Sequence, residues 1–258
     1  MSLDEWLSGV LRALERTVSS WPWMGMKLRQ IFTRLAPIHE TTVRGLSIRA
    51  ILPLHQVGTY AEFRAWGSRE PEVLDWIDSF QTPFCFLDVG SNFGTESLYA
   101  AKRHPQGSVV ACDPEFLGGY NLAVNILLNG LENIDNYAVA LGASPGWLAI
   151  PENLNYLNVI PAKKYAAARR LVRCESIDSL LDGQSVEYLK IDVDGLEQDI
   201  LSGAKLTLAS RRLRSLIVEV DEPEARGPVI EMLKAAGYDL ISVSGASGNN
   251  HRFDRRAA

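Results

Sequence analysis

The sequence predicts an α/β fold: a mostly parallel, doubly wound sheet of seven strands with an antiparallel strand at its edge, preceded by an N-terminal helical extension. Two stretches carry this prediction. Residues 84–97 read FCFLDVGSNFGTES, which is an apolar run, an acidic strand end, a glycine-bearing turn and the start of a helix. Residues 107–113 read GSVVACD, a second apolar strand that also ends in an acidic residue.

Length and composition set the outer bounds. A chain of 258 residues is long enough for one large α/β domain, and a hydrophobic share of 47% is ordinary for a globular protein. The net charge of −5 argues against a protein that binds nucleic acid through its phosphates, so no nucleic-acid partner is expected. Cys85, Cys112 and Cys174 lack metal-type spacing, which predicts core thiols in a reducing compartment. Because the chain has no apolar stretch of about 18 residues and no signal-peptide pattern, we expect a cytoplasmic protein.

The N-terminal part, residues 1–80, is expected to form the helical extension, and residues 81–258 the main domain. Apolar residues recur at helical spacing over residues 3–18 and 24–35, with Pro22 between them. Peripheral contact with a membrane surface is one interpretation of these helices. Packing on the main domain or on a second copy of the chain is favoured, because acidic residues interrupt a thin positive charge. These acidic residues are Asp4, Glu5 and Glu15.

The remaining elements follow from apolar runs and from the residues that end them. Residues 41–54 alternate weakly and predict an antiparallel pair closed near Gly45, and residues 70–80 predict a helix with Pro71 in its first turn. Residues 142–170 predict a hairpin and a loop over the site. Strands are expected at residues 84–87, 107–113, 133–141, 171–174, 186–192, 216–220, 238–243 and 251–253. Helices are expected from residue 96 and at residues 116–128, 176–181, 196–210 with a break at Gly203, and 224–236.

The glycine spacing after the first core strand indicates the ligand. A dinucleotide site requires G-x-G-x-x-G, so that pyrophosphate sits on the helix N-terminus. This chain has Asp88, Gly90 and Gly94, with Asn92 where the second glycine would be. The pattern D-x-G-x-x-x-G suits a ligand without phosphates and with a cationic amino-acid tail, which describes S-adenosylmethionine. Asp113 ends the second strand 25 positions after Asp88, where a carboxylate is placed to bind ribose hydroxyls. A generic turn with a capping aspartate is the alternative.

Several carboxylates are expected at the ends of two later strands. Asp192 and Asp194 end one strand, and Glu219 and Asp221 repeat the spacing on the next, which should be its neighbour. Three interpretations remain open: a hard divalent ion, a general base of raised pKa, or capping of backbone N–H groups beside Lys190. Base and orientation roles are favoured over the metal, because no His or Asn joins the set at recognisable spacing.

Five segments together resemble the FkbM-type methyltransferases: FLDVGSNFGTES, VVACDPE, YNLAVNILLNGLENI, SIDSLL and YLKIDVDGLEQDIL. The resemblance covers about residues 58–243. It implies the class I, Rossmann-like, S-adenosylmethionine-dependent methyltransferase fold and O-methylation of a hydroxyl on a sugar, glycan or secondary metabolite. Where the family usually has Glu, this chain has Asp194, which keeps the charge and shortens the reach.

The resemblance also implies site residues. Those that shape the methionine side of the cofactor pocket are Asp88, Gly90, Ser91, Asn92 and Gly94. Asp113 would hold the ribose, whereas Glu115 is expected to start a helix. Methyl transfer from an activated sulfonium mainly requires that the acceptor be oriented and lose its proton. Asp192, Asp194 and Lys190 are the candidates for this chemistry, with a small-molecule or glycan acceptor as the partner.

Two other classes of protein remain open. An NAD-dependent oxidoreductase could use the same sheet, but the missing G-x-G-x-x-G disfavours it. A non-catalytic methyltransferase-like module could scaffold a partner through its N-terminal helices, which the intact pocket pattern disfavours.

Overall fold

A computed structural model provides the structure of the chain, which divides into two compact units, Met1–Ile38 and His39–Ala258. The structure describes residues 38–52, 59–151, 169–193, 195–245 and 248–256. The helices expected at residues 3–18 and 24–35 therefore lie outside the described residues. The expected division at residue 80 stays a prediction, although four elements before that residue belong to the unit that contains the main sheet.

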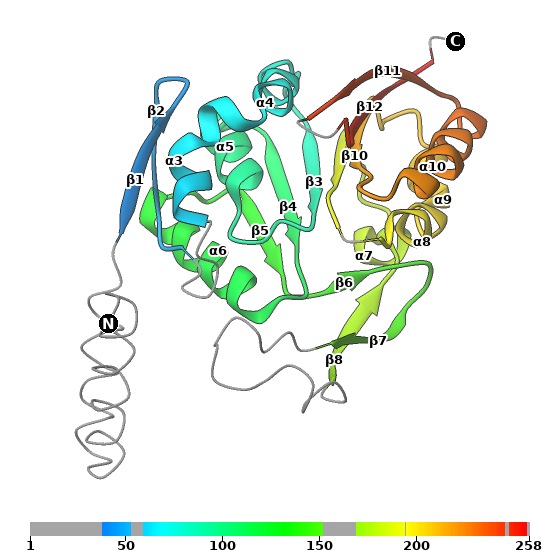
Figure 1. Ribbon diagram of the computed structural model, residues 1–258, viewed down its shortest axis with the longest axis horizontal. Helices are drawn as coiled ribbons and strands as arrows, with labels where there is room; N and C mark the ends of the chain where they lie inside the picture. The colour runs from blue at the N-terminus through cyan, green and yellow to red at the C-terminus, as the bar shows by residue number, and fades with distance from the viewer. Residues whose placement is uncertain (1–37, 53–58, 152–168, 194, 246–247, 257–258) are drawn as a thin grey trace, which may run out of the picture. The chain divides into compact units, whose positions relative to one another are not determined.

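The main sheet has seven strands within the described residues, as expected (Figure 1). Their spatial order is β11 (Tyr238–Ser244), β12 (Asn250–Arg255), β10 (Ser215–Glu219), β9 (Tyr188–Ile191), β3 (Cys85–Val89), β4 (Ser108–Cys112) and β5 (Ile134–Tyr137). β12 runs antiparallel to both of its neighbours, and the other strands share one direction. The antiparallel strand thus lies one place in from the edge, between β10 and β11.

Helices cover both faces of this sheet because its strands are apolar on both sides. Phe86, Tyr188 and Ile217 point to one face, and Leu87 and Leu189 to the other. The first face is covered by α3 (Thr59–Arg69), α4 (Pro71–Asp78), α5 (Thr95–Arg103) and α6 (Phe116–Asn129). The second is covered by α7 (Ile177–Leu181), α8 (Glu197–Ser202), α9 (Lys205–Ala209) and α10 (Pro223–Ala235). The core is therefore two apolar clusters separated by the sheet.

Two small sheets complete the described part of the chain. β1 (His39–Val43) and β2 (Leu46–Ala50) form the expected antiparallel pair around Gly45. β6 (Ala140–Leu141) and β7 (Gly146–Pro151) pair with β8 (Arg169–Glu175). The strand expected over residues 133–141 is thus split between two sheets, and the chain bends where the N–H of Val139 donates to the carbonyl of Tyr137. Residues 152–168, in the loop expected over the site, lie outside the described residues.

Helix ends follow the local sequence. Glu115 caps α6, since its side chain accepts a hydrogen bond from the N–H of Gly118, and this confirms its expected role. α6 ends at Gly130 in the left-handed conformation. The break between α8 and α9 falls at Gly203, where a Cβ atom would overlap the carbonyl oxygen of Gly142. Backbone approach from a distant segment therefore explains the glycine that interrupts this helical stretch.

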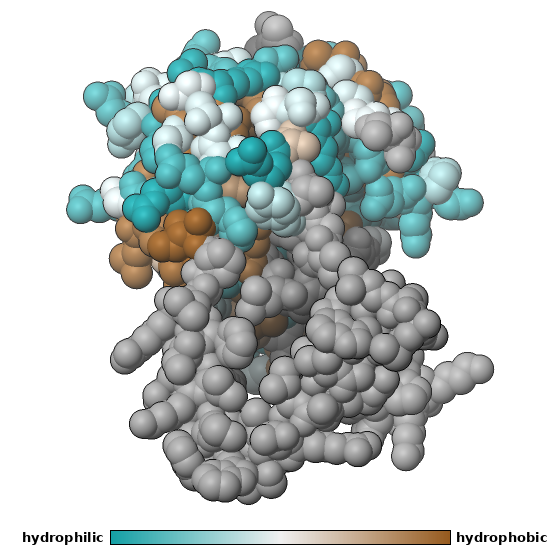
Figure 2. Space-filling view, turned by 60° about the vertical axis from the view of Figure 1, so that its left-hand side comes forward, coloured by the Kyte–Doolittle hydropathy of each residue, from teal (hydrophilic) through white to brown (hydrophobic). Residues whose placement is uncertain are grey.

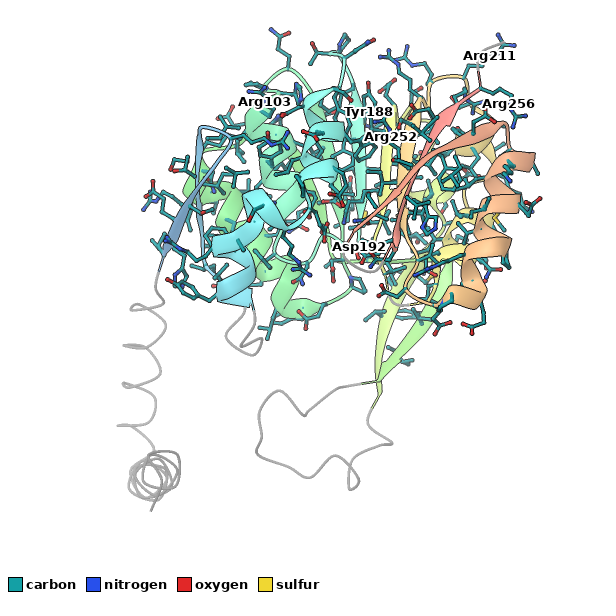
Figure 3. The ribbon with its side chains drawn as sticks, turned by 45° about the horizontal axis from the view of Figure 1, so that its top comes forward. Arg103, Tyr188, Asp192, Arg211, Arg252 and Arg256 are labelled. Carbon is teal, nitrogen blue, oxygen red and sulfur yellow. The ribbon has the colours of Figure 1, made fainter. Side chains whose placement is uncertain are left out.

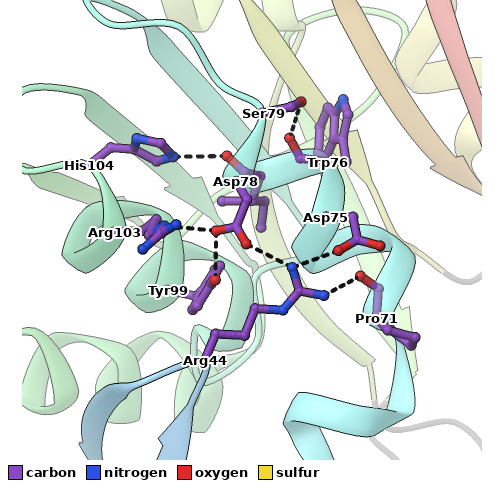
Figure 4. Close-up of polar contacts among 10 residues, drawn as sticks. Arg44, Pro71, Asp75, Trp76, Asp78, Ser79, Tyr99, Arg103 and His104 are labelled. Atoms are coloured by element: carbon purple, nitrogen blue, oxygen red, sulfur yellow. Dashed lines mark hydrogen bonds and ion pairs between the residues drawn. The ribbon is translucent and has the colours of Figure 1, made fainter.

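A network of charged side chains fastens the β1–β2 hairpin to α4 and α5 (Figure 4). Asp78, at the end of α4, accepts hydrogen bonds from Arg44 and from the hydroxyl of Tyr99, each at 2.7 Å, and pairs with Arg103 at 2.9 Å. Arg44 also pairs with Asp75 at 2.7 Å. These contacts join three elements that are distant in sequence.

On the face shown in Figure 2, most described residues are hydrophilic, and apolar residues gather at the lower left and at the top of that part. No described helix is both long and apolar enough to cross a membrane. All three cysteines are buried and unpaired, which confirms their expected role as core thiols.

Candidate active site

The strand register brings the candidate residues to one end and one face of the main sheet. Asp88 lies beside Lys190 in the β3–β9 pair, and Glu219 lies opposite Asn250 in the β10–β12 pair. Asp192 follows two positions after Lys190, so both project from the same face. Figure 3 shows Asp192 at the opposite end of β9 from Tyr188. The two strands that end in acidic residues were expected to be adjacent in the sheet, and the parallel pairing of β9 with β10 confirms this.

The loop between β3 and α5 lies close to the neighbouring backbone. Gly90 has φ +84°, and a Cβ atom there would overlap the carbonyl oxygen of Asp192. Gly94 has φ +94°, and a Cβ atom there would overlap the side chain of Leu122 in α6. The N–H of Gly90 donates to the carbonyl of Cys112 at 2.9 Å. Both glycines have a backbone conformation that other residues rarely adopt, and at Gly90 the neighbouring backbone also leaves no space for a side chain.

Asp88 is a fully buried carboxylate with an unused oxygen. Its Oδ2 accepts a hydrogen bond from the Ser97 hydroxyl at 2.6 Å, whereas Oδ1 has no hydrogen-bond partner among the described residues. Burial raises the pKa of Asp88 to about 7, although Lys190 and Ser97 oppose the shift. The hydroxyl of Ser91, in the adjacent loop, is also buried without a partner. Unsatisfied buried polar atoms are costly, so this corner is suited to a polar or cationic ligand.

Asp113 organises the loop as well as ending β4. Its Oδ2 accepts from the N–H of Asn92 at 2.8 Å, and its Oδ1 accepts from the N–H of Glu115 at 2.7 Å. Asn92 has φ +48°, so this hydrogen bond holds a residue in the left-handed region. Burial raises the pKa of Asp113, although the two N–H donors oppose the shift. Each carboxylate oxygen keeps a second lone pair that a ribose hydroxyl could use.

Lys190 is buried beneath the acidic side chains and pairs with Asp192. Burial alone would lower the pKa of Lys190, but the carboxylates of Asp192, Glu96 and Asp88 hold it well above its usual value. Burial would raise the pKa of Asp192, but Lys190, with smaller contributions from Glu219 and Arg69, lowers it. The structure therefore gives the opposite direction from the raised pKa considered for Asp192 as a base.

Glu219, beside Asp192, is a further carboxyl with a raised pKa at this edge. Its carboxyl lies within hydrogen-bonding reach of Asp192, and its Oε1 accepts from the amide of Asn249. Burial and the Asp192 carboxylate raise the pKa of Glu219 to about 8. The position of Glu219 at a strand end follows from the sequence, but its contact with Asp192 depends on strand order.

The N-terminal region also contributes to this edge through Glu70, which the sequence did not identify as a site residue. Glu70 precedes α4, and burial together with the Glu96 carboxylate raises its pKa. Pro71 marks a helix start there, but no local pattern places that start over β9.

Two expectations at this edge remain predictions: the role of Asp194, and the preference for base and orientation roles over a metal ion. Asp194 lies outside the described residues. Among the residues that the structure describes, no group of three or more His, Cys, Asp and Glu side chains is arranged as a metal site.

Comparison with known proteins gives one curated relative and several solved structures. The chain is 26% identical over 194 residues to methyltransferase sdnD of Sordaria araneosa, which covers 61% of this chain and 74% of that protein. It is similar to the structure of methyltransferase FkbM from Methylobacillus flagellatus KT, with 13% identity and a TM-score of 0.48 over 79% of this chain and 55% of that one. It is also similar to a precorrin-6y C5,15-methyltransferase from Geobacter metallireducens GS-15, with 13% identity and a TM-score of 0.46 over 73% of this chain and 87% of that one.

The family assignment rests on a sequence profile, because these identities and TM-scores are low. The profile described as "Methyltransferase FkbM domain" matches residues 88–240, which is more than half of the chain. The strand order confirms the expected seven-stranded, mostly parallel sheet, with helices on both of its faces. The protein therefore belongs to the FkbM methyltransferase family, whose methyl donor is S-adenosylmethionine.

Proposed function

We propose that the protein transfers the methyl group of S-adenosylmethionine to a hydroxyl oxygen of a sugar, glycan or secondary metabolite. One observation carries the proposal. The buried carboxylate of Asp88, with its unused oxygen, lies beside Lys190 on the same sheet edge as Asp192 and Glu219. A site for a cationic ligand and a set of proton-accepting groups are therefore adjacent.

The loop after β3 supports the cofactor side of the proposal. Asp88 Oδ1 would accept from the ammonium group of the methionine moiety, and Asp113 would bind the ribose hydroxyls. The glycine backbone at Gly90 and Gly94, together with Ser91 and Asn92, would line the methionine side. When bound, S-adenosylmethionine supplies a methyl carbon made electrophilic by its sulfonium.

The later strands support the acceptor side. A hydroxyl attacks more readily as its proton is removed, so an acceptor hydroxyl requires a nearby base. Lys190 keeps Asp192 ionised and fixes its direction. We propose that Asp192, Asp194 and Lys190 orient the acceptor at this edge, and that the acceptor is a small molecule or glycan, not a nucleic acid.

Labelled methyl transfer tests this function. The whole chain is incubated with methyl-labelled S-adenosylmethionine and with extracts separated into glycans, lipids and small metabolites. We expect label in a product whose methyl group is bound to oxygen, and none with Asp88→Asn, which keeps the size of the side chain but loses its charge. Label on nitrogen or carbon would contradict the O-methylation, and S-adenosylmethionine binding without transfer in any fraction would favour the non-catalytic module.

A further inference from the structure

Asp192 and Glu219 form a direct carboxyl–carboxyl contact. β9 and β10 pair in parallel as far as Ile191 and Val218, and the two acids follow one position later on neighbouring strands. Their carboxyl groups lie within hydrogen-bonding reach of each other. Two carboxyl groups this close repel each other when both are ionised, and a proton on one of them lets it donate to the other.

Each carboxyl of the pair also accepts a hydrogen bond from another side chain. The ammonium of Lys190 binds Asp192 Oδ2, and the amide of Asn249 donates to Glu219 Oε1. Asn249 also donates to Asp221 at 2.8 Å, which orients its amide. The ionised partner is therefore Asp192, and the proton belongs mainly to Glu219.

A buried polar side chain beside the pair independently points to a ligand. Asn250 lies directly opposite Glu219 in the β10–β12 ladder, so the two side chains project from the same face. Asn250 is 2% exposed, yet neither its Nδ2 nor its Oδ1 has a hydrogen-bond partner among the described residues. An amide left unpaired in this way is matched by a ligand that both donates and accepts, as a hydroxyl does.

The charges that face Glu219 come from several elements. Asp192 and Lys190 face it from β9, and Glu70 faces it from the start of α4. Asp192 and Glu70 raise the pKa of Glu219, Lys190 lowers it, and burial raises it further, to about 8. With that pKa, Glu219 would carry the proton of the pair at neutral pH and lose it in mild alkali.

We propose that Asp192 and Glu219 act as one proton-sharing unit and that Glu219 accepts the hydroxyl proton of the acceptor. This inference rests on the proposed O-methyl transfer. The reactive form is the pair without its shared proton. As the acceptor oxygen bonds to the methyl carbon, the carbon–sulfur bond breaks with its electron pair left on sulfur, and the hydroxyl proton passes to Glu219. Asp192 is then the positioning residue, and its charge keeps Glu219 a strong enough base.

The first test needs no acceptor. Full-length chain carrying carbon-13 at glutamate Cδ is titrated by NMR from about pH 4 to about pH 10, without cofactor. One glutamate signal should titrate with a midpoint of about 8 and disappear in Glu219→Gln. It should remain in Glu231→Gln, a matched change at an exposed site on α10, and move towards the ordinary range in Asp192→Asn. A titration without any such glutamate, or one unchanged in Glu219→Gln, would overturn the shared proton.

The second test separates base from binding. Glu219→Gln should bind S-adenosylmethionine as the wild type does, in calorimetry, but lose roughly 100-fold or more in kcat on the fraction that accepts label. Wild-type kcat should rise with pH to a plateau with a midpoint of about 8, and the residual kcat of the variant should lack this rise. Transfer by Glu219→Gln at the wild-type rate would overturn the role of Glu219 as the base and leave the proposed O-methylation standing. Absence of transfer by the wild type would overturn the O-methylation itself, and the proton transfer with it.

Discussion

Gly90 is the residue at which the loop after β3 meets the strand end that carries Asp192. Its φ of +84° is shared by Gly45 in the β1–β2 turn, but a Cβ atom at Gly45 would have nothing within 4 Å. Gly45→Ala should therefore cost only the left-handed backbone, about 1–2 kcal/mol in the free energy of unfolding. Gly90→Ala should cost that plus the displacement of Asp192, and should lose S-adenosylmethionine binding.

Urea unfolding and calorimetry of both variants measure this difference. If the two variants lose equal stability and Gly90→Ala keeps its cofactor affinity, then a Cβ atom at Gly90 does not displace Asp192, contrary to this prediction.

Asp113 combines two tasks, because it holds the N–H groups of Asn92 and Glu115 and is proposed to hold the ribose. Asp113→Ala should lower the affinity for S-adenosylmethionine about tenfold to a hundredfold, as expected for about 1.5–3 kcal/mol from a lost hydrogen bond to a charged group. The chain should stay folded by circular dichroism.

Glu115→Ala is the matched control for Asp113→Ala, since it removes a helix cap at the same junction. It should cost about 1 kcal/mol of stability and little affinity. If both variants lose the same affinity for S-adenosylmethionine, the loss comes from a disturbed loop conformation, and the ribose does not bind to Asp113.

At the residue scale, a site residue could be predicted where a single physical reason explains its residue type at that position. Gly90 and Asp113 could be predicted because close backbone approach and a strand-end acid depend on local spacing. That the strands of Glu219 and Asp192 are neighbours could be predicted, but how burial divides a proton between the two carboxyls could not.

At the scale of elements, Asp78 is the residue through which the β1–β2 hairpin, α4 and α5 are joined. Burial would raise the pKa of Asp78, but hydrogen bonds from Tyr99 and Arg44 and the charge of Arg103 lower it. A lowered pKa gives stability that is present above the unfolded value and is lost as pH falls through the folded value. Asp78→Asn should therefore lose about 1.5–3 kcal/mol at neutral pH, and less as the pH falls below about 4.

Asp75→Asn provides the comparison, because Asp75 contacts the same Arg44 from a side chain that is 71% exposed. An exposed ion pair contributes about 1 kcal/mol at most, so this variant should differ little from wild type. Urea unfolding at neutral and acid pH measures both. A loss for Asp78→Asn that stays constant with pH would show that the carboxylate charge is not what holds the hairpin.

Element positions and the pairings β1–β2 and β9–β10 could be predicted from the sequence, whereas other pairings could not. The break at Gly203 and the end at Gly130 follow from residue types. By contrast, β12 enters between β10 and β11, and residues 133–141 split between two sheets. Such pairings join segments far apart in the sequence, and no local apolar pattern specifies them.

At the scale of the whole molecule, one face of the main sheet depends on elements that precede residue 81. Phe63, Trp66 and Trp76 are buried in the cluster that covers this face. Removing one such aromatic side chain costs about 3–5 kcal/mol, and a typical domain has only about 5–15 kcal/mol in all. A chain that begins at residue 39 should therefore fold, and one that begins at residue 81 should not.

Circular dichroism and thermal unfolding of the two shortened chains measure this outcome. A cooperative transition in the chain that begins at residue 81 would support the division at residue 80 predicted from the sequence. It would also show that α3 and α4 are dispensable for the sheet.

The central claim is that the edge formed by Asp88, Gly90, Gly94 and Asp113 binds S-adenosylmethionine. Calorimetry of the full-length chain with S-adenosylmethionine, with its demethylated product and with NAD tests this claim most directly. We predict measurable heat of binding with the two sulfur ligands, strongly reduced by Asp88→Asn, and none with NAD. Binding of NAD without binding of either sulfur ligand would contradict the claim.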